Sequence, residues 1–280
     1  MKSIFFYKVG GVVLSSADSI VISMFLGLET LGKYNNYYTI IIMLFSFIQV
    51  YIDAMFAGVG NSIIEESVEK NYNDFRKMNF FHNWFVGWCS ICLVCLYQTF
   101  IEVWLGSEYL FSLKVPILLA AYFYAWKMMD IVNLYKEAGG MWKYDKYRPL
   151  VASAVNLSIN LALVTKLGIY GIILSTIFSI VFVILPWSSY ILFKYYFKQD
   201  YKNFYVTYFK NTFIILVAGI ITFYVTSFIE IENLILQLFI KGGICLLLPN
   251  IIIFMMNVKN KEFIEAEKWG RQKITNILKK

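Results

Sequence analysis

The stretch from Val115 to Val164 decides the fold: it reads VPILLAAYFYAWKMMDIVNL, then YKEAGGMWKYDKYR, then PLVASAVNLSINLALV. Two apolar runs flank a short loop rich in Lys and Arg. Lys127 and Asp130 are three residues apart in the first run, so they share one helical face inside the expected hydrocarbon layer. This pattern predicts a polytopic membrane protein with a polar path between its helices.

The composition of the whole chain agrees with this prediction. Hydrophobic residues make up 59% and charged residues 15% of the 280 residues, with a mean hydropathy of +0.63; a soluble domain has roughly a quarter charged residues. The net charge of +7 raises the possibility of a nucleic-acid partner. Most basic residues flank apolar runs, however, so we assign the charge to orientation in a bilayer and expect no nucleic-acid partner.

The predicted fold class is all-α: a polytopic membrane helix bundle of about eight transmembrane helices. The expected spans lie near residues 4–26, 37–59, 83–105, 115–134, 150–165, 168–190, 211–228 and 236–256. The first run has no small-residue cleavage site after it and is long enough to span, so it is expected to stay in the membrane. The predicted domains are a six-helix lobe at 1–190, an additional helix pair at 191–256 and a basic amphipathic cytoplasmic tail at 257–280.

Basic residues are distributed unevenly between the two predicted sides of the membrane. Of the 25 Lys and Arg residues, 19 fall on the side that holds both termini, three on the other side and three within spans. Cytoplasmic loops carry the excess of Lys and Arg in membrane proteins. Both termini are therefore predicted to be cytoplasmic. The connections at 27–36 and 61–82 are expected to be loops.

Charged groups within the spans are the candidate functional residues, since an ionised group at mid-bilayer costs at least ~2.5 kcal/mol. The candidates among them are Lys8 and Asp18 in the first span, Asp53 in the second, and Lys127 with Asp130 in the fourth. Two interpretations stay open for the carboxylates: they line a water-filled cavity, or they form buried ion pairs. Lys8 has a further alternative, snorkelling to the interface. The Ser and Asn stripes of the spans fit helix–helix contacts as well as ligand binding.

Several kinds of site are not expected. The only histidine, His82, is predicted at a loop edge, where it cannot build a catalytic or metal site by itself. The four cysteines lie in apolar spans with no His beside them, which indicates packing and not metal ligation. No phosphate-binding loop of the GxxxxGK[ST] type occurs. We expect no enzymatic activity, no cofactor and no metal.

Two segments carry a family resemblance. Residues 8–40, KVGGVVLSSADSIVISMFLGLETLGKYNNYYTI, resemble the start of the second half of bacterial polysaccharide transporters, the lipid-linked oligosaccharide flippases of the multidrug/oligosaccharidyl-lipid/polysaccharide exporter superfamily. Residues 135–179, YKEAGGMWKYDKYRPLVASAVNLSINLALVTKLGIYGIILSTIFS, are similar to the later spans of that family. The resemblance covers most of residues 1–190 and implies a MATE-like second lobe followed by a terminal helix pair.

The resemblance implies a substrate and a location. The substrate would be an undecaprenyl-diphosphate-linked oligosaccharide, of the kind used for O-antigen or capsule, moved across the bacterial cytoplasmic membrane. Lys8, Lys127 and Arg148 would meet the diphosphate, with Arg favoured for bidentate contact, and Asp18, Asp53 and Asp130 would bind a coupling proton or cation. The expected partners are this lipid, membrane lipids, and a first lobe or second copy that closes the cavity.

Three alternatives to this function stay open. A drug or cation exporter of the same superfamily is weakly disfavoured by the mixture of Lys and Asp. A membrane polysaccharide polymerase is disfavoured by short predicted external loops, and an inactive fragment is the third alternative.

Overall fold

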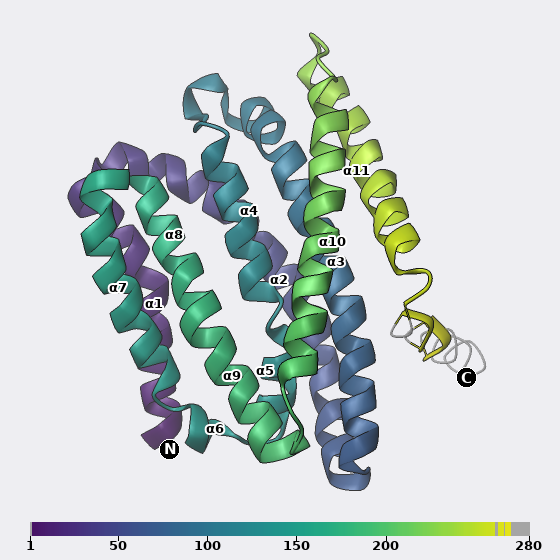
Figure 1. Cartoon of the computed structure of the whole chain (residues 1–280). Helices are drawn as coiled ribbons and strands as arrows, with labels where there is room; N and C mark the ends of the chain where they lie inside the picture. Colours follow the sequence, from purple (N-terminus) through teal and green to yellow (C-terminus); the bar gives the residue numbers. More distant parts are fainter. Residues whose placement is uncertain (1, 261–262, 266, 270–280) are drawn as a thin grey trace.

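The regular structure of the described residues is entirely helical (Figure 1). The computed structural model describes residues 2–260, 263–265 and 267–269, with the side chains of residues 2–10 and 13–15 left out. The helices in chain order are α1 (Lys2–Phe25), α2 (Gly27–Glu65), α3 (Val68–Leu105), η1 (Ser107–Tyr109), α4 (Lys114–Lys127), α5 (Asp130–Ala138), α6 (Trp142–Asp145), α7 (Arg148–Leu167), α8 (Ile169–Ser179), η2 (Ile180–Ile184), α9 (Leu185–Leu192), η3 (Phe193–Phe197), α10 (Lys202–Ser227) and α11 (Leu234–Asn257).

Seven helical segments among the described residues are long and apolar enough to cross a membrane. They are α2, α3, α4 with α5, α6 with α7, α8 through η3, α10 and α11. For α1, the apolar stretch with described side chains, Ser16–Phe25, is shorter than a span. The chain is thus a multi-pass membrane protein with an all-helical fold, and seven of the eight predicted spans are confirmed.

The predicted loop at 27–36 is wrong, because this segment is helical, and the predicted loop at 61–82 is much too long, because only Glu66 and Ser67 separate α2 from α3. The turn after α1 takes only Leu26 and Gly27. The φ angle of Gly27 is +86°, which a glycine adopts without strain. Good helix formers follow, including the pair Glu29–Lys33, 3.3 Å apart at i,i+4 spacing. The 39 residues of α2 reach about 58 Å, well beyond a hydrocarbon core of about 30 Å.

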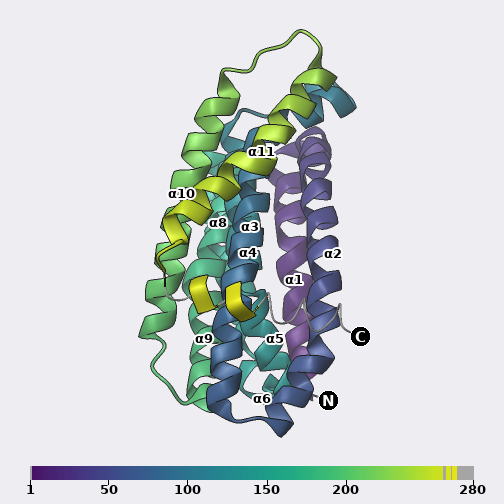
Figure 2. The same cartoon turned by 90° about the vertical axis from the view of Figure 1, so that its right-hand side faces the viewer.

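The first apolar run of the Val115–Val164 stretch, which forms α4 and α5, lies at the centre of the bundle. In the segment α4–α5, 72% of the apolar membrane-spanning stretch is buried, which is the largest share among the described spans. Its contacts are with α2, α3, α8 and α9, and the core side chains Leu119, Phe123 and Ile131 are fully buried. Helices α1 and α7 pack together at one side of the bundle, while α10 and α11 pack against α3 at the other (Figures 1 and 2).

The chain passes from α7 into α8 through a one-residue turn at Gly168, close to the boundary between the expected spans 150–165 and 168–190. The next segment runs continuously from Ile169 to Phe197, so the predicted domain boundary at residue 190 falls inside a helix. Pro186 has no N–H for the carbonyl four residues earlier, and the turn just before it, η2, is a wider π-helix. The proline therefore loosens this helix without ending it.

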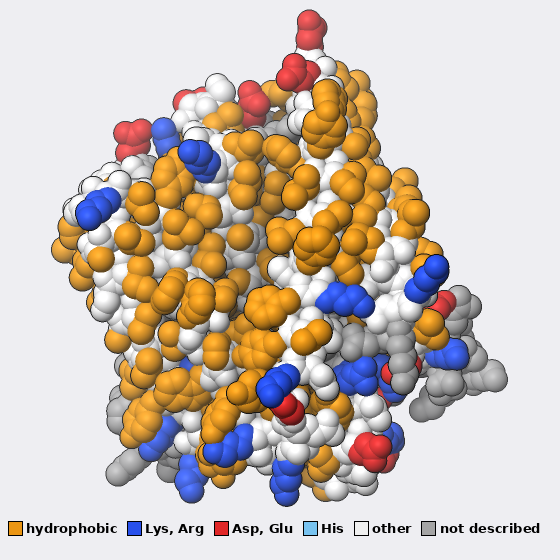
Figure 3. All heavy atoms as spheres, viewed as in Figure 1, with side chains coloured by type: hydrophobic (Ala, Val, Ile, Leu, Met, Phe, Trp, Pro, Cys, Tyr) orange, Lys and Arg blue, Asp and Glu red, His pale blue; other side chains and the backbone are white. Residues whose placement is uncertain are grey.

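Basic side chains gather toward the end of the bundle where α1 begins, below a broad apolar belt, and several acidic side chains lie at the opposite end (Figure 3). This is the polarity expected of a membrane bundle; which end is cytoplasmic stays a prediction. Much of the predicted tail at 257–280 lies outside the described residues. In its described part, Phe263 is buried and packs against Phe80 and Trp84 of α3.

Candidate functional site

The predicted site residues do not converge on one groove. Among the described residues they occupy four places: a group at the α4–α5 break, a group around α6, a group between α1, α7 and α8, and the outward face of α2. Lys8 lies on α1, but its side chain is outside the described residues. The four places differ in burial and in how completely their charges are paired.

The ion pair predicted from the spacing of Lys127 and Asp130 is present. Helix α4 ends at Lys127 and α5 begins at Asp130, and the ammonium Nζ lies 2.9 Å from the carboxylate Oδ2. The two side chains are 4% and 11% exposed. The Lys127 ammonium also lies 4.8 Å from the centre of the Phe45 ring on α2. Each charge of the pair therefore has its partner inside the bundle.

His82 belongs to the same group, and its prediction at a loop edge is wrong. It lies in the interior of α3 and is buried, because the segment expected to be a loop continues that helix. Its Nε2 is 2.6 Å from the backbone carbonyl of Lys127, and its Nδ1 is 2.5 Å from the Tyr51 hydroxyl of α2. The carbonyl is at the C-terminal end of α4, where helix carbonyls lack a partner within the helix. His82 thus ties α2 and α3 to the break between α4 and α5.

The second group surrounds Asp145 at the end of the short helix α6. Its carboxylate accepts hydrogen bonds from Arg148 Nε at 2.8 Å and Nη2 at 3.0 Å, and from Lys136 Nζ at 2.6 Å. Lys136 also donates to the Ser188 hydroxyl of α9 at 3.1 Å. All three charged side chains are buried, although the sequence places them in a loop. Arg148, expected to meet a diphosphate, is here the bidentate partner of Asp145.

Asp18 is held by neutral donors from two other helices. Asn160 of α7 donates to its Oδ1 at 2.9 Å, and Thr176 of α8 donates to its Oδ2 at 2.8 Å. Asn156 of α7 donates in turn to the Thr176 hydroxyl at 2.9 Å, and Ser175 is hydrogen-bonded to Asn160. The Asn and Ser stripes noted in the sequence therefore meet at Asp18. In this arrangement they act as helix–helix contacts.

The polar stripe of α2 differs from these groups because it faces outward. We call the exposed residues Ser46, Gln49 and Asp53 the α2 outer stripe. The Gln49 side-chain amide donates to the Asp53 carboxylate at 2.8 Å. Only 17% of the apolar membrane-spanning stretch of α2 is buried. A Cβ at Gly58 or at Gly60 would have no neighbouring atom within 4 Å. A carboxylate on a membrane-spanning helix is here turned away from the rest of the bundle.

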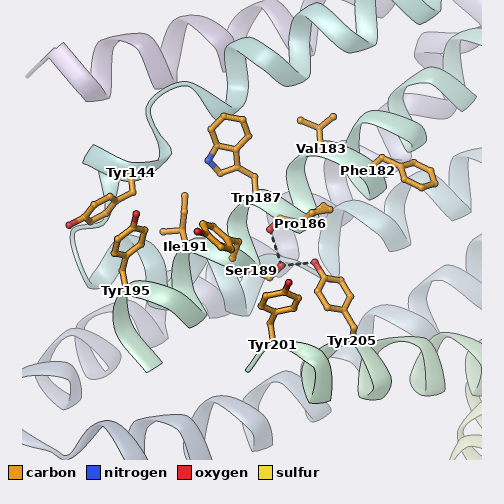
Figure 4. A pocket seen from close by; sticks show the side chains of 11 residues that line it. Tyr144, Phe182, Val183, Pro186, Trp187, Ser189, Ile191, Tyr195, Tyr201 and Tyr205 are labelled. Atoms are coloured by element: carbon orange, nitrogen blue, oxygen red, sulfur yellow. Dashed lines mark hydrogen bonds between the residues drawn. The ribbon is translucent and has the colours of Figure 1, made fainter. Parts of the chain in front are cut away.

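A pocket of about 600 Å³ lies between α9 and the start of α10, and none of the predicted site residues lines it (Figure 4). Aromatic side chains line most of it, and the Ser189 and Tyr205 hydroxyls are 2.7 Å apart at its base. Tyr144 and Tyr195 stack with ring centres 3.9 Å apart. Tyr and Trp are enriched where membrane helices meet the bilayer surface. We therefore assign this pocket to the interfacial aromatic belt.

The sequence missed three participants in these groups. Tyr51 is hydrogen-bonded to His82 but comes from a different helix. Lys136 and Asp145 form the group that holds Arg148, but they come from a segment expected to be a solvated loop. No group of three or more His, Cys, Asp or Glu side chains in the described part of the chain is arranged to hold a metal ion. Comparison with known proteins gave no match to a protein family, to a curated protein or to a solved structure.

Proposed function

We propose that this chain is a membrane transporter that moves an undecaprenyl-diphosphate-linked oligosaccharide between leaflets of the bacterial cytoplasmic membrane for surface-polysaccharide synthesis, with both termini cytoplasmic and without an enzymatic step. The proposal draws on the resemblance of residues 8–40 and 135–179 to polysaccharide transporters. The structure adds a support that does not depend on that resemblance: the α2 outer stripe.

The outward position of Asp53 carries the proposal. Lipid-facing carboxylates on membrane helices are rare, and such groups usually face a water-filled cavity or another bundle. Since Asp53 is exposed and accepts a hydrogen bond from Gln49 of the same helix, its surroundings must supply the remaining hydration. We infer that α2 lines a hydrated crevice, closed on its far side by a further helix lobe or a second copy of the chain.

Such a crevice suits a lipid-linked sugar. Moving its diphosphate and hydroxyl groups through hydrocarbon without hydrogen-bond partners is prohibitively costly. A hydrated path along the α2 outer stripe would solvate the head group while the prenyl tail stays in the bilayer. Lys127 remains the proposed cation for the diphosphate; it is paired and buried here, so it must leave Asp130 when the lobes move.

Water access to α2 tests the proposal directly. In a variant with the four native cysteines replaced, Ser46→Cys should react with a membrane-impermeant thiol reagent in proteoliposomes. Phe213→Cys is the matched control, because Phe213 is 62% exposed near the middle of α10 and should face lipid. Equal protection of both thiols would show that α2 faces hydrocarbon and would overturn the proposal. In the same vesicles, a lipid-linked oligosaccharide should become accessible to a lectin outside only when the protein is present.

A further inference from the structure

The carboxylate of Asp130 faces two groups that can each carry a positive charge. Lys127 Nζ lies at 2.9 Å and His82 Nε2 at 3.9 Å from the same oxygen, Oδ2. All three side chains are buried or nearly so. In such surroundings one negative charge is well matched by one positive charge, and a second positive charge is costly. Asp130 can therefore keep one cationic partner at a time.

The hydrogen bonds of His82 fix where a further proton would go. Nε2 lies against a carbonyl oxygen, which only accepts, so Nε2 carries the proton of the neutral ring. Nδ1 then accepts a hydrogen bond from the Tyr51 hydroxyl. A hydroxyl can reverse this role, because it donates and accepts. The lone pair of Nδ1, which accepts the Tyr51 hydrogen bond in the neutral ring, is thus the site for a second proton, and the Tyr51 hydroxyl then turns and accepts from it.

We propose that His82 binds a proton and then replaces Lys127 as the cationic partner of Asp130. When Lys127 leaves to pair with an anionic ligand, Asp130 loses its cation, and a proton from water adds to Nδ1 of His82. The imidazolium then replaces the ammonium as the partner of Asp130. When the ligand leaves, Lys127 returns and His82 releases the proton. The exchange rests on the proposed function only for the identity of the anion, a prenyl diphosphate.

The surroundings of His82 favour such an exchange over a fixed pair. Lys127 reaches Asp130 through a flexible four-carbon stem and lies against Phe45 on α2, the helix that carries the outer stripe. The titratable or charged groups that face the Tyr51–His82 pair in the described structure are Lys127 from α4, Asp130 from α5 and, on α3 itself, Cys89 beside Tyr51. The alternation therefore depends on Lys127 and Asp130.

His82 is the only histidine of the chain, so its ring can be observed without assignment. The full chain is labelled with ¹⁵N-histidine, purified with a histidine-free tag, and placed in nanodiscs near neutral pH. The wild type should show a neutral ring protonated at Nε2. Lys127→Met should raise the ratio of imidazolium to neutral ring by at least about tenfold, because Asp130 then has no other partner.

Three further variants keep the test independent of folding. Lys127→Arg, Asp130→Asn and the double variant Lys127→Met/Asp130→Asn should all retain the neutral ring, because Asp130 either keeps a cation or carries no charge. A neutral ring in a folded Lys127→Met variant would overturn the exchange. An imidazolium in Asp130→Asn would overturn it equally, since its stabilising charge would come from elsewhere.

Farnesyl diphosphate then tests the ligand in the same samples. Added to the wild type, it should shift His82 toward the imidazolium, and it should leave Asp130→Asn unchanged. If the Lys127 variants behave as expected but farnesyl diphosphate has no effect on the wild type, the exchange stands and the assignment of a diphosphate to Lys127 fails. The two proposals are therefore separable.

Discussion

The group around Asp145 and the α2 outer stripe both place charge on membrane helices, but they treat it in opposite ways. Asp145 accepts three hydrogen bonds from Lys136 and Arg148, and all three side chains are buried. Asp53 is exposed and receives a hydrogen bond from Gln49 on its own helix. The charge of Asp145 is paired entirely inside the bundle. The charge of Asp53 needs hydration or a partner from outside the bundle.

This difference separates two meanings of an intramembrane charge. A carboxylate such as Asp145, which accepts hydrogen bonds from two buried cations, holds helices in position. A group that faces outward on a membrane-spanning helix needs water, a partner chain or a ligand. From the sequence, Asp53 lies in a span and Asp145 in a loop, and neither position shows which carboxylate is paired inside the bundle; their packing does.

The largest expected effect comes from breaking the buried group. Asp145→Ala leaves the Lys136 ammonium and the Arg148 guanidinium buried without their shared carboxylate. Removing one partner of a buried ion pair costs about 3–5 kcal/mol, so the free energy of unfolding should fall by that amount. Unfolding in mixed detergent micelles measures it.

Asp200→Ala is the matched control for this prediction. Asp200 is 57% exposed, lies 3.6 Å from the Lys202 ammonium and accepts a hydrogen bond from the Lys202 backbone N–H at 2.9 Å, so the loss should be about 1 kcal/mol. If Asp145→Ala were as stable as Asp200→Ala, the buried group would not hold α5, α6 and α7 together, and the contrast with α2 would lose its basis.

A smaller effect is expected at two glycines that differ in the same way. A Cβ at Gly171 would lie 2.8 Å from Leu163 Cβ and 2.9 Å from its carbonyl oxygen, where α7 and α8 are in contact. Gly171→Ala should therefore destabilise the protein by about 1–3 kcal/mol through overpacking. Gly58→Ala on α2 meets nothing within 4 Å and should stabilise by up to about 1 kcal/mol through helix propensity.

The same unfolding measurement distinguishes these two variants. Destabilisation by Gly58→Ala would mean that something packs on this side of α2 in the micelle. A second copy of the chain is the first candidate, and the mass of the detergent complex would identify it.

The sequence predicts the course of the chain well because apolar runs and turns are local features. The hairpin at Gly168 follows from a glycine between two apolar runs, and its φ of 57° is one that glycine adopts easily. The lengths of α2 and α3 are missed, since hydropathy marks the hydrocarbon layer and not the end of a helix. Residues 61–82 contain no proline or glycine and simply continue as helix to either side of Ser67.

The site is predicted only where partners share one helix face. Lys127 and Asp130 are three residues apart, so their contact follows from helical geometry. Lys136 and Asp145 meet across the turn between α5 and α6, and Tyr51 meets His82 from another helix. Such contacts depend on how helices pack. A single sequence gives no measure of that packing, so it predicts neither Tyr51 as the partner of His82 nor Asp145 as the partner of Lys136.

We expect the smallest change in the free energy of unfolding at Asp53. Substitution of Asp53 also tests most directly the difference between the α2 outer stripe and the group around Asp145. Asp53→Ala removes an exposed carboxylate that accepts a hydrogen bond from Gln49 on its own helix, so the free energy of unfolding should change by less than about 0.5 kcal/mol. Transport of a lipid-linked oligosaccharide in proteoliposomes should nevertheless fall by about tenfold, equivalent to about 1.4 kcal/mol in the barrier. Glu at this position should restore much of the rate, because it returns the charge to the same face.

Asp18→Asn is expected to give the opposite result, a loss of stability without a loss of transport. Asp18 is bonded to Asn160 and Thr176 inside the bundle, so this substitution should lower stability while leaving any transport in the folded fraction near the wild-type rate. A variant at Asp53 that lost stability but kept transport would reverse the roles assigned to the two regions. In that case, α2 would face a structural partner and the path of the substrate would have to lie elsewhere in the bundle.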